Sequence, residues 1–479
     1  MPYAIRKALY FLLLVICVKI FFGETVYAQK KKKLTQTVIA ENLLQSGPML
    51  GYSEMREVLL WVQTTKEAEV YINYTEVRTE KDTSGIVIYL PKKEATTLED
   101  IFSSQKVKTT AENAFIAKII LKDLQPGKSY EYFVIIDGIK VNLPYKSVFH
   151  TQPLWQWRTD APDFTFAMGS CLYVNDSVYD RPGKPYGGNY KILTSIYEKK
   201  PDMMLWLGDN TYLREADWGS ASGILYRYTH SRSLKQMQPL LATAHNYAIW
   251  DDHDYGPNDS DRSFRGKKLT KQAFDMFWCN PTSGNHNNEG NYTSFEWNDV
   301  QFFLLDDRYF RSPNNRTTGD RTMLGKEQLQ WLIDGLVSSN ATFKIVAMGG
   351  QILNPAQVKE NYSNYSQERD SLLSIIRKEN IKGLLFLSGD RHFTELTKMD
   401  RSGTYPLYDF TISPLTSGVH KSAEKEANTM RVEGTLVQQQ NFAVGKLSGK
   451  GQERTLTVTV YDIDGKMLWE RSIAAKNLK

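Results

Sequence analysis

Five short apolar runs recur along the chain after residue 160, and each is followed within a few residues by a side chain that binds metals. The runs are residues 164–168, 203–207, 247–250, 300–305 and 383–387, and the side chains that follow are Cys171, Asp209, Asp251, Asp306 and Asp390. Continuous apolar stretches bounded by turn residues predict strands that are buried on both faces. Because functional groups lie at the carboxyl ends of such strands, we expect these side chains to gather at one sheet edge.

Such an edge would carry an excess of negative charge. Carboxylates that lie a few ångströms apart repel one another unless a cation neutralises them. The pattern of strands and acids therefore predicts a metal centre.

Helical patterns alternate with these strands. They cover residues 190–199, 326–336 and 368–379, and alternation of this kind indicates an α/β layer architecture. Near the end of the chain, residues 455–463 and 466–473 flank Asp464-Gly465, which predicts a hairpin that adds edge strands to the same sheet.

The first part of the chain has a different pattern. Residues 34–151 contain evenly spaced strand-like runs, which predict a small β-sandwich domain. Within it, Tyr130 opens a strand just after the turn at Pro126-Gly127, and this resembles the tyrosine corner of fibronectin type III domains. Residues 152–163, with Pro153 and Pro162, are interpreted as a linker to a second domain over residues 164–475.

The amino terminus has the layout of a secretory signal peptide. Arg6 and Lys7 precede an apolar stretch, and small residues end at Ala28, so we expect a signal over residues 1–28. The alternative is an uncleaved anchor, which is disfavoured because Lys19 interrupts a stretch already short for a membrane span. No later segment is long and apolar enough to cross a membrane, so an exported protein, periplasmic or extracellular, is predicted.

Length, charge and cysteine content limit the number of domains, the binding partners and the roles of the cysteines. A chain of 479 residues predicts two to three domains, and its net charge of +5 arises partly from the run at residues 30–33, so no nucleic-acid-binding surface is expected. Cys17 would leave with the signal peptide, and Cys171 and Cys279 would remain. A disulfide between them is one interpretation, and use of the Cys171 thiolate as a metal ligand is the other.

The segment Gly208-Asp209-Asn210-Thr211-Tyr212 follows the strongest predicted strand. An aspartate at a strand end can bridge two cations, and a tyrosine three residues later can reach the same metal. A phenol binds metals well only as phenolate, which requires a strongly Lewis-acidic ion such as ferric iron. The alternative for Gly208-Asp209 alone is an ordinary turn or helix cap.

Two further segments concentrate acids and histidines. One of them is Trp250-Asp251-Asp252-His253-Asp254, which Asn258 follows shortly after. A solvated acidic loop is the alternative interpretation, but the apolar residues just before the run argue against full exposure. Ser388-Gly389-Asp390-Arg391-His392 offers an acid and an imidazole two residues apart, so both side chains could face one site. Arg391 cannot act as a ligand because it does not lose its proton, but it could contact a substrate anion.

Arg308 follows Asp306 and Asp307 and precedes Arg311. Arginine forms planar, bidentate hydrogen bonds to phosphate oxygens, so Arg308 could hold a substrate phosphoryl group. A structural ion pair with a neighbouring acid is the other interpretation.

Taken in order, these segments resemble the secreted alkaline phosphatases and phosphodiesterases of the PhoD type, within the calcineurin-like metallophosphoesterases. The resemblance covers most of the chain after the signal peptide. It implies an α/β fold, a four-layer αββα sandwich preceded by a fibronectin III-like β-sandwich domain, and a site that holds Fe³⁺ together with Ca²⁺.

The resemblance also implies a set of ligands. Cys171, Asp209, Tyr212 and His392 would surround the ferric ion, and Asp252 and Asp390 would serve the calcium side. This division agrees with ligand preference, since thiolate, phenolate and imidazole suit iron whereas carboxylates suit calcium. Further candidate positions near the second metal are Asn258, Asp307 and Gln351. Members of the wider superfamily often have a histidine ligand in the segment where this chain has Gln351.

The implied reaction is hydrolysis of phosphate mono- or diesters by a metal-activated hydroxide. His253 would protonate the leaving oxygen, and Arg308 or Arg391 would stabilise charge on the phosphoryl group. Rival hypotheses are a phospholipase or cell-wall polymer phosphodiesterase, and a non-catalytic adhesion or carbohydrate-binding protein with structural calcium. Cys171 and Tyr212 argue against the last, because a structural calcium site does not use thiolate or phenolate.

Overall fold

The computed structural model of the protein describes residues 41–81, 87–91, 101–285 and 289–479. The predicted signal peptide over residues 1–28 lies outside these residues. None of the helices in the described ranges is long and apolar enough to cross a membrane.

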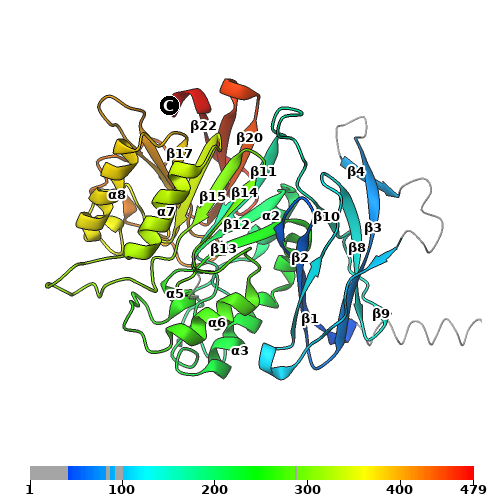
Figure 1. The fold of residues 1–479 in the computed structure, drawn as a ribbon. Helices are drawn as coiled ribbons and strands as arrows, with labels where there is room; N and C mark the ends of the chain where they lie inside the picture. The colour runs from blue at the N-terminus through cyan, green and yellow to red at the C-terminus, as the bar shows by residue number, and fades with distance from the viewer. Residues whose placement is uncertain (1–40, 82–86, 92–100, 286–288) are drawn as a thin grey trace, which may run out of the picture.

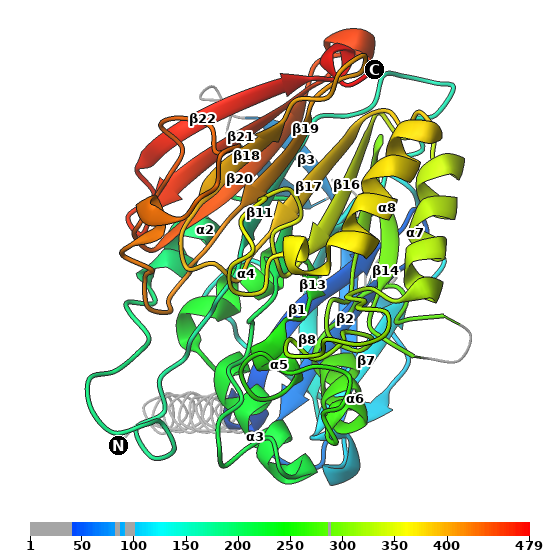
Figure 2. The ribbon, with the colours of Figure 1, turned by 90° about the vertical axis from the view of Figure 1, so that its left-hand side faces the viewer.

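The strands of the described residues form three sheets, of nine, seven and six strands, and the nine-stranded and six-stranded sheets, called here the two large sheets, pack face to face (Figures 1 and 2). In order across the sheet, the strands of the nine-stranded sheet are β22 (Met467–Ala474), β21 (Thr455–Asp462), β20 (Asn441–Ser448), β11 (Phe164–Gly169), β12 (Met203–Leu207), β13 (His245–Ile249), β1 (Leu44–Ser53), β2 (Val58–Thr64) and β7 (Ile116–Leu121). Those of the six-stranded sheet are β14 (Thr293–Trp297), β15 (Val300–Leu304), β16 (Phe343–Met348), β17 (Leu384–Ser388), β19 (Leu407–Thr411) and β18 (Glu395–Met399).

The five predicted strands form the centre of this pair of sheets. β11, β12 and β13 are parallel neighbours in one sheet, and β15, β16 and β17 are parallel neighbours in the other. Every residue of β12, β13 and β17 is buried, as the continuous apolar runs predict. The strands thus end together at one edge, where the predicted ligands follow them.

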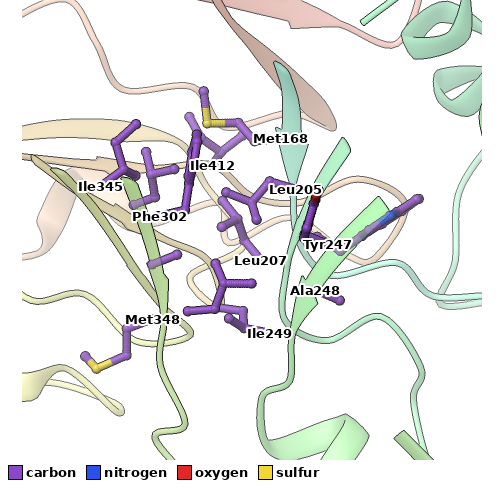
Figure 3. Packing of buried hydrophobic residues seen from close by; sticks show 14 of the residues in the cluster. Met168, Leu205, Leu207, Tyr247, Ala248, Ile249, Phe302, Ile345, Met348 and Ile412 are labelled. Atoms are coloured by element: carbon purple, nitrogen blue, oxygen red, sulfur yellow. The ribbon is translucent and has the colours of Figure 1, made fainter. Parts of the chain in front are cut away.

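Apolar side chains from both sheets fill the space between them (Figure 3). The ring of Tyr247 stacks on Phe295 with centroids 3.7 Å apart, and Phe302 contacts Phe295 and Phe166. Burying one large apolar side chain contributes about 1.5–3 kcal/mol. This core fixes the two sheets against each other and so fixes the strand ends that carry the candidate site.

Helices cover the outer faces. On the six-stranded sheet lie α7 (Lys326–Ser338) and α8 (Ser366–Lys378), and the Trp331 ring of α7 packs on Phe303 of β15 (Figure 1). The remaining helices are α2 (Lys191–Glu198), α3 (Ala221–Arg232), α4 (Gln238–Thr243), α5 (Asp252–Tyr255) and α6 (Lys267–Phe277). The layers confirm the predicted mixed α/β architecture.

The amino-terminal strands belong to two different sheets. A third sheet contains β10 (Val148–His150), β8 (Ser129–Ile136), β3 (Glu69–Lys81) and β4 (Val87–Pro91), with the short strands β5 (Phe102–Ser103), β6 (Val107–Lys108) and β9 (Ile139–Lys140) beside it. It packs through a separate apolar core on β1, β2 and β7, which belong to the large sheet because β1 pairs in parallel with β13.

A sandwich is therefore present in this region, but one of its sheets is continuous with the large sheet. The hydroxyl of Tyr130 accepts a hydrogen bond from the Gln125 N–H at 3.1 Å, the local contact of a tyrosine corner. The fibronectin III-like assignment and the boundary at residue 151 stay predictions. Residues 152–163 contain no helix or strand, and the predicted hairpin over β21 and β22 is confirmed.

Candidate metal centre

The predicted ligands follow the ends of strands in both large sheets. Cys171 follows β11, Asp209 follows β12, and Asp390 and His392 follow β17. All four have positive φ angles, of 61°, 54°, 60° and 56° respectively. Residues other than glycine seldom adopt this left-handed conformation, and such strain concentrates at functional sites, where the surrounding structure imposes it.

One group of donor atoms converges where β11, β12 and β17 end. Ligand atoms of Cys171, Asp209 and His392 all lie within 4.8 Å of one another. The Tyr212 hydroxyl joins them, 3.1 Å from Asp209 Oδ2 and 3.4 Å from His392 Nε2, and Cys171 Sγ lies 3.6 Å from the same Asp209 oxygen. The structure thus brings together the four residues that were expected to surround a ferric ion.

A second group adjoins the first and shares Asp209 with it. Donor atoms of Asp209, Asp252 and His253 also lie within 4.8 Å of one another. Asp252 begins the short helix α5, and its Oδ2 accepts a hydrogen bond from the Asp259 N–H at 2.7 Å. An open cavity of about 320 Å³ lies over both groups, and Asn258, Asp390 and Arg391 also line it.

The electrostatics of this cluster fit a bound cation. Burial, with Asp252, Asp254 and Asp390 nearby, raises the pKa of Asp209 well above its usual range. Burial likewise raises the pKa of Asp390 to about 7, with contributions from Glu360 and Asp252. Asp390 Oδ2 is buried and has no hydrogen-bond partner among the described residues, and the Arg391 guanidinium, 3.9 Å away, offsets only part of its charge. Buried carboxylates in this state are stabilised when a metal ion supplies the missing positive charge.

The neutral donors point to the same conclusion. Burial and the nearby Asp209 carboxylate raise the pKa values of the Cys171 thiol and the Tyr212 phenol well above their usual ranges. Burial lowers the pKa of His392 to about 4, so its imidazole is neutral and available as a ligand at neutral pH. Thiol, phenol, imidazole and carboxylate together form a donor set that suits a Lewis-acidic metal, with carboxylate oxygens left for a harder one.

His253 lies at the edge of the cluster. Its ring stacks on Tyr212 with centroids 4.2 Å apart, and its Nδ1 has no hydrogen-bond partner among the described residues. Burial lowers its pKa, although the Asp252 carboxylate opposes this shift. The imidazole therefore borders the cavity, and one of its ring nitrogens is buried without a hydrogen bond.

Three candidates lie elsewhere. Arg308 is fully buried; its Nη1 and Nη2 donate to the two carboxylate oxygens of Glu360 at 2.8 and 2.6 Å, and its Nε donates to Asp251. Asp307 accepts a hydrogen bond from the Gly350 N–H. Gln351 donates to Glu395 and Thr411 in a buried network.

The structure does not bring these three side chains to the cavity. For Arg308, the geometry corresponds to the structural ion pair that was the alternative interpretation. Arg391 does line the cavity, and its Nη2 donates to the Glu426 carboxylate.

Sequence reasoning missed two acids that shape this site. Glu360 lines the cavity and connects it to Arg308 and Arg311, from a loop that carries no motif. Asp254 accepts hydrogen bonds from the N–H groups of Asn210, Thr211 and Asp251, and so it holds the turns after β12 and β13 together. The acidic run containing Asp254 was the signal for a site, but this positioning role has no sequence signature.

Two packed sheets thus hold a buried cluster of metal-binding donors at their strand ends, which is the arrangement of a metal-dependent enzyme. A family model described as PhoD-like phosphatase matches residues 166–457, and the chain belongs to this family. The predicted resemblance is thereby confirmed.

Known relatives agree with this assignment. Alkaline phosphatase D of Bacillus subtilis strain 168 is 23% identical in an alignment of 388 positions that covers 67% of this chain and 64% of that protein, slightly less than two thirds of its length. A solved structure of PhoD superposes with a TM-score of 0.69 at 17% identity, over 90% of this chain and 92% of that one. Purple acid phosphatase PPD1 from yellow lupin gives a TM-score of 0.59 at 12% identity, over 89% and 74% of the two chains. The two solved structures show that the fold is shared.

Proposed function

We propose that the protein is a metal-dependent phosphoesterase that hydrolyses phosphate esters outside the cytoplasm. The observation that carries this proposal is the convergence of Cys171, Asp209, Tyr212 and His392 in one buried group. Family membership supports the reaction class, and the basic, apolar amino-terminal sequence ending at Ala28 supports export.

We assign the metal-binding residues as follows. Cys171, Tyr212 and His392 would hold Fe³⁺, Asp209 would bridge, and Asp252 and Asp390, with Asn258 nearby, would hold Ca²⁺. When bound, the metals would polarise the phosphoryl oxygens and lower the pKa of water.

The remaining groups act on the substrate. His253 is placed to donate a proton to the leaving oxygen, because its ring lines the cavity beside Asp209 and Asp252. Arg391 lines the same cavity and adds positive charge near the phosphoryl group.

The test is turnover of a chromogenic phosphate monoester and diester by the metal-loaded protein, compared with Asp209→Ala and His392→Ala. Both variants should lose at least about 10²-fold in kcat, which is the scale expected when a catalytic metal or its orientation is lost. The matched control is Asp261→Ala, an acid on the same stretch of chain outside the cavity, which should keep near-normal turnover. Near-normal rates in the two ligand variants would reject the site.

A further inference from the structure

A second cavity, of about 260 Å³, adjoins the metal centre. Its walls include Tyr173, Tyr186, Tyr212, Arg214, His253 and Asn258. Tyr186, His253 and Asn258 also line the cavity over the metal centre, so the two cavities are neighbours. Any group in the second cavity therefore lies beside the proposed proton donor, His253.

Arg214 is the one strongly buried cation of this second cavity among the described residues, with 8% of its surface exposed. Its Nε donates to the Tyr173 hydroxyl at 3.2 Å, and that hydroxyl donates to Asp180 at 2.8 Å. Its guanidinium carbon lies 4.8 Å from the centre of the Tyr173 ring and 5.5 Å from that of Tyr212. These contacts fix the orientation of the side chain.

No described carboxylate lies within the ion-pair distance of 4.0 Å from the Arg214 guanidinium, although Arg214 contributes to lowering the pKa of Glu215. Its neighbours differ in this respect, because Arg181 pairs with Glu215 at 2.6 Å and Arg227 pairs with Asp217 at 2.8 Å. An arginine side chain cannot lose its proton, and burial of an unpaired charge is costly. The aromatic rings offset part of this cost through cation–π contact, but an oxyanion would match the planar fork of the guanidinium far better.

We propose that the second cavity binds the leaving group of the substrate. Arg214 would select leaving groups that carry an oxyanion, which is either a carboxylate or a second phosphate. This inference rests on the proposed function. The scissile phosphoryl group would occupy the metal centre, and His253, which borders both cavities, would face the oxygen between them. The oxyanion bound by Arg214 is therefore a separate group from the phosphoryl that is hydrolysed.

The experiment compares kcat/KM for 4-carboxyphenyl phosphate and phenyl phosphate in the metal-loaded wild-type protein, Arg214→Gln and Arg214→Met. In each Arg214 variant, the ratio of the carboxylated to the plain substrate should fall by about 10-fold or more, as expected when a hydrogen bond to a charged group is lost. The matched control is Arg181→Gln, since Arg181 lines the same cavity but is exposed and paired with Glu215. It should keep the wild-type ratio.

A second readout does not depend on hydrolysis. Benzoate should bind the metal-free wild-type protein in a calorimetric titration, and about 10-fold more weakly or not at all to the Arg214 variants. If the Arg214 variants lose kcat/KM equally for both esters, so that the ratio is unchanged, the inference is overturned. If the wild-type protein hydrolyses neither ester, the proposed function fails, and benzoate binding alone then tests the role of Arg214. Equal binding of benzoate by the wild type and the variants, or no binding by the wild type, overturns that role.

Discussion

Four of the predicted ligands have left-handed backbone just after the ends of strands: Cys171, Asp209, Asp390 and His392. These residues could be predicted, because each follows an apolar run and carries a side chain that is unusual at the end of a buried strand. The orientation of Arg308 could not be predicted. Its partners Asp251 and Glu360 lie 57 and 52 residues away in sequence, and only the folded chain decides between a structural ion pair and a contact with substrate.

His253 should contribute according to the leaving group. General acid catalysis is worth about 10²–10⁴-fold, and it matters most when the leaving oxygen is strongly basic. His253→Asn should therefore slow hydrolysis of an alkyl phosphate by about 10²-fold and that of p-nitrophenyl phosphate by about tenfold or less. Steady-state kinetics at matched metal content tests this expectation. Equal losses on the two substrates would show that His253 does not act as the acid.

At the scale of elements, the sequence predicts the strands, but it predicts only part of the pairing between them. Continuous apolar runs give buried strands directly, and β11, β12, β13 and β17 follow this rule. The parallel pairing of β1 with β13, Leu50 opposite His245, joins segments that are far apart in sequence. No local pattern encodes such a contact, so the extension of the large sheet into the amino-terminal sandwich emerged only from the fold.

The packing of the two large sheets should control stability. Phe302 is fully buried between them, in contact with Phe295 and Phe166. Phe302→Ala should lower the free energy of unfolding by about 3–5 kcal/mol, because it removes apolar contact and leaves a cavity. Val337→Ala on α7, where the side chain is 50% exposed, is the control and should cost less than about 1 kcal/mol. Urea unfolding measures both values, and similar losses would contradict the described core.

At the scale of the whole molecule, two buried carboxyl groups should lower the stability of the metal-free protein as pH rises, which is opposite to the usual effect of carboxyl groups. Burial raises the pKa values of Asp254 and Asp390 to about 7, so the folded protein keeps protons that the unfolded chain releases near pH 4. Since the folded state binds more protons in this window, these two groups lower stability as pH rises from about 4 to about 7.

Thermal unfolding of the metal-free protein tests this expectation. Asp390→Asn removes one of the two groups, so the change in its Tm from pH 5 to pH 8 should be more favourable to the folded state than that of the wild type. Added metal should raise the Tm more at pH 8 than at pH 5, because ligands must be deprotonated to bind it. A variant with the same pH dependence as the wild type would show that Asp390 is not protonated in the folded, metal-free state.

The most direct test of the metal centre is the metal content and visible spectrum of the purified wild-type protein beside Asp209→Ala and Tyr212→Phe. The wild type should contain iron together with a second metal and should absorb visible light, because thiolate and phenolate bound to ferric iron are coloured. Tyr212→Phe should lose much of this absorption, and Asp209→Ala should lose metal as well. A colourless, iron-free wild-type protein with full phosphoesterase activity would contradict the assignment of Cys171, Asp209, Tyr212 and His392 as ligands of a ferric ion.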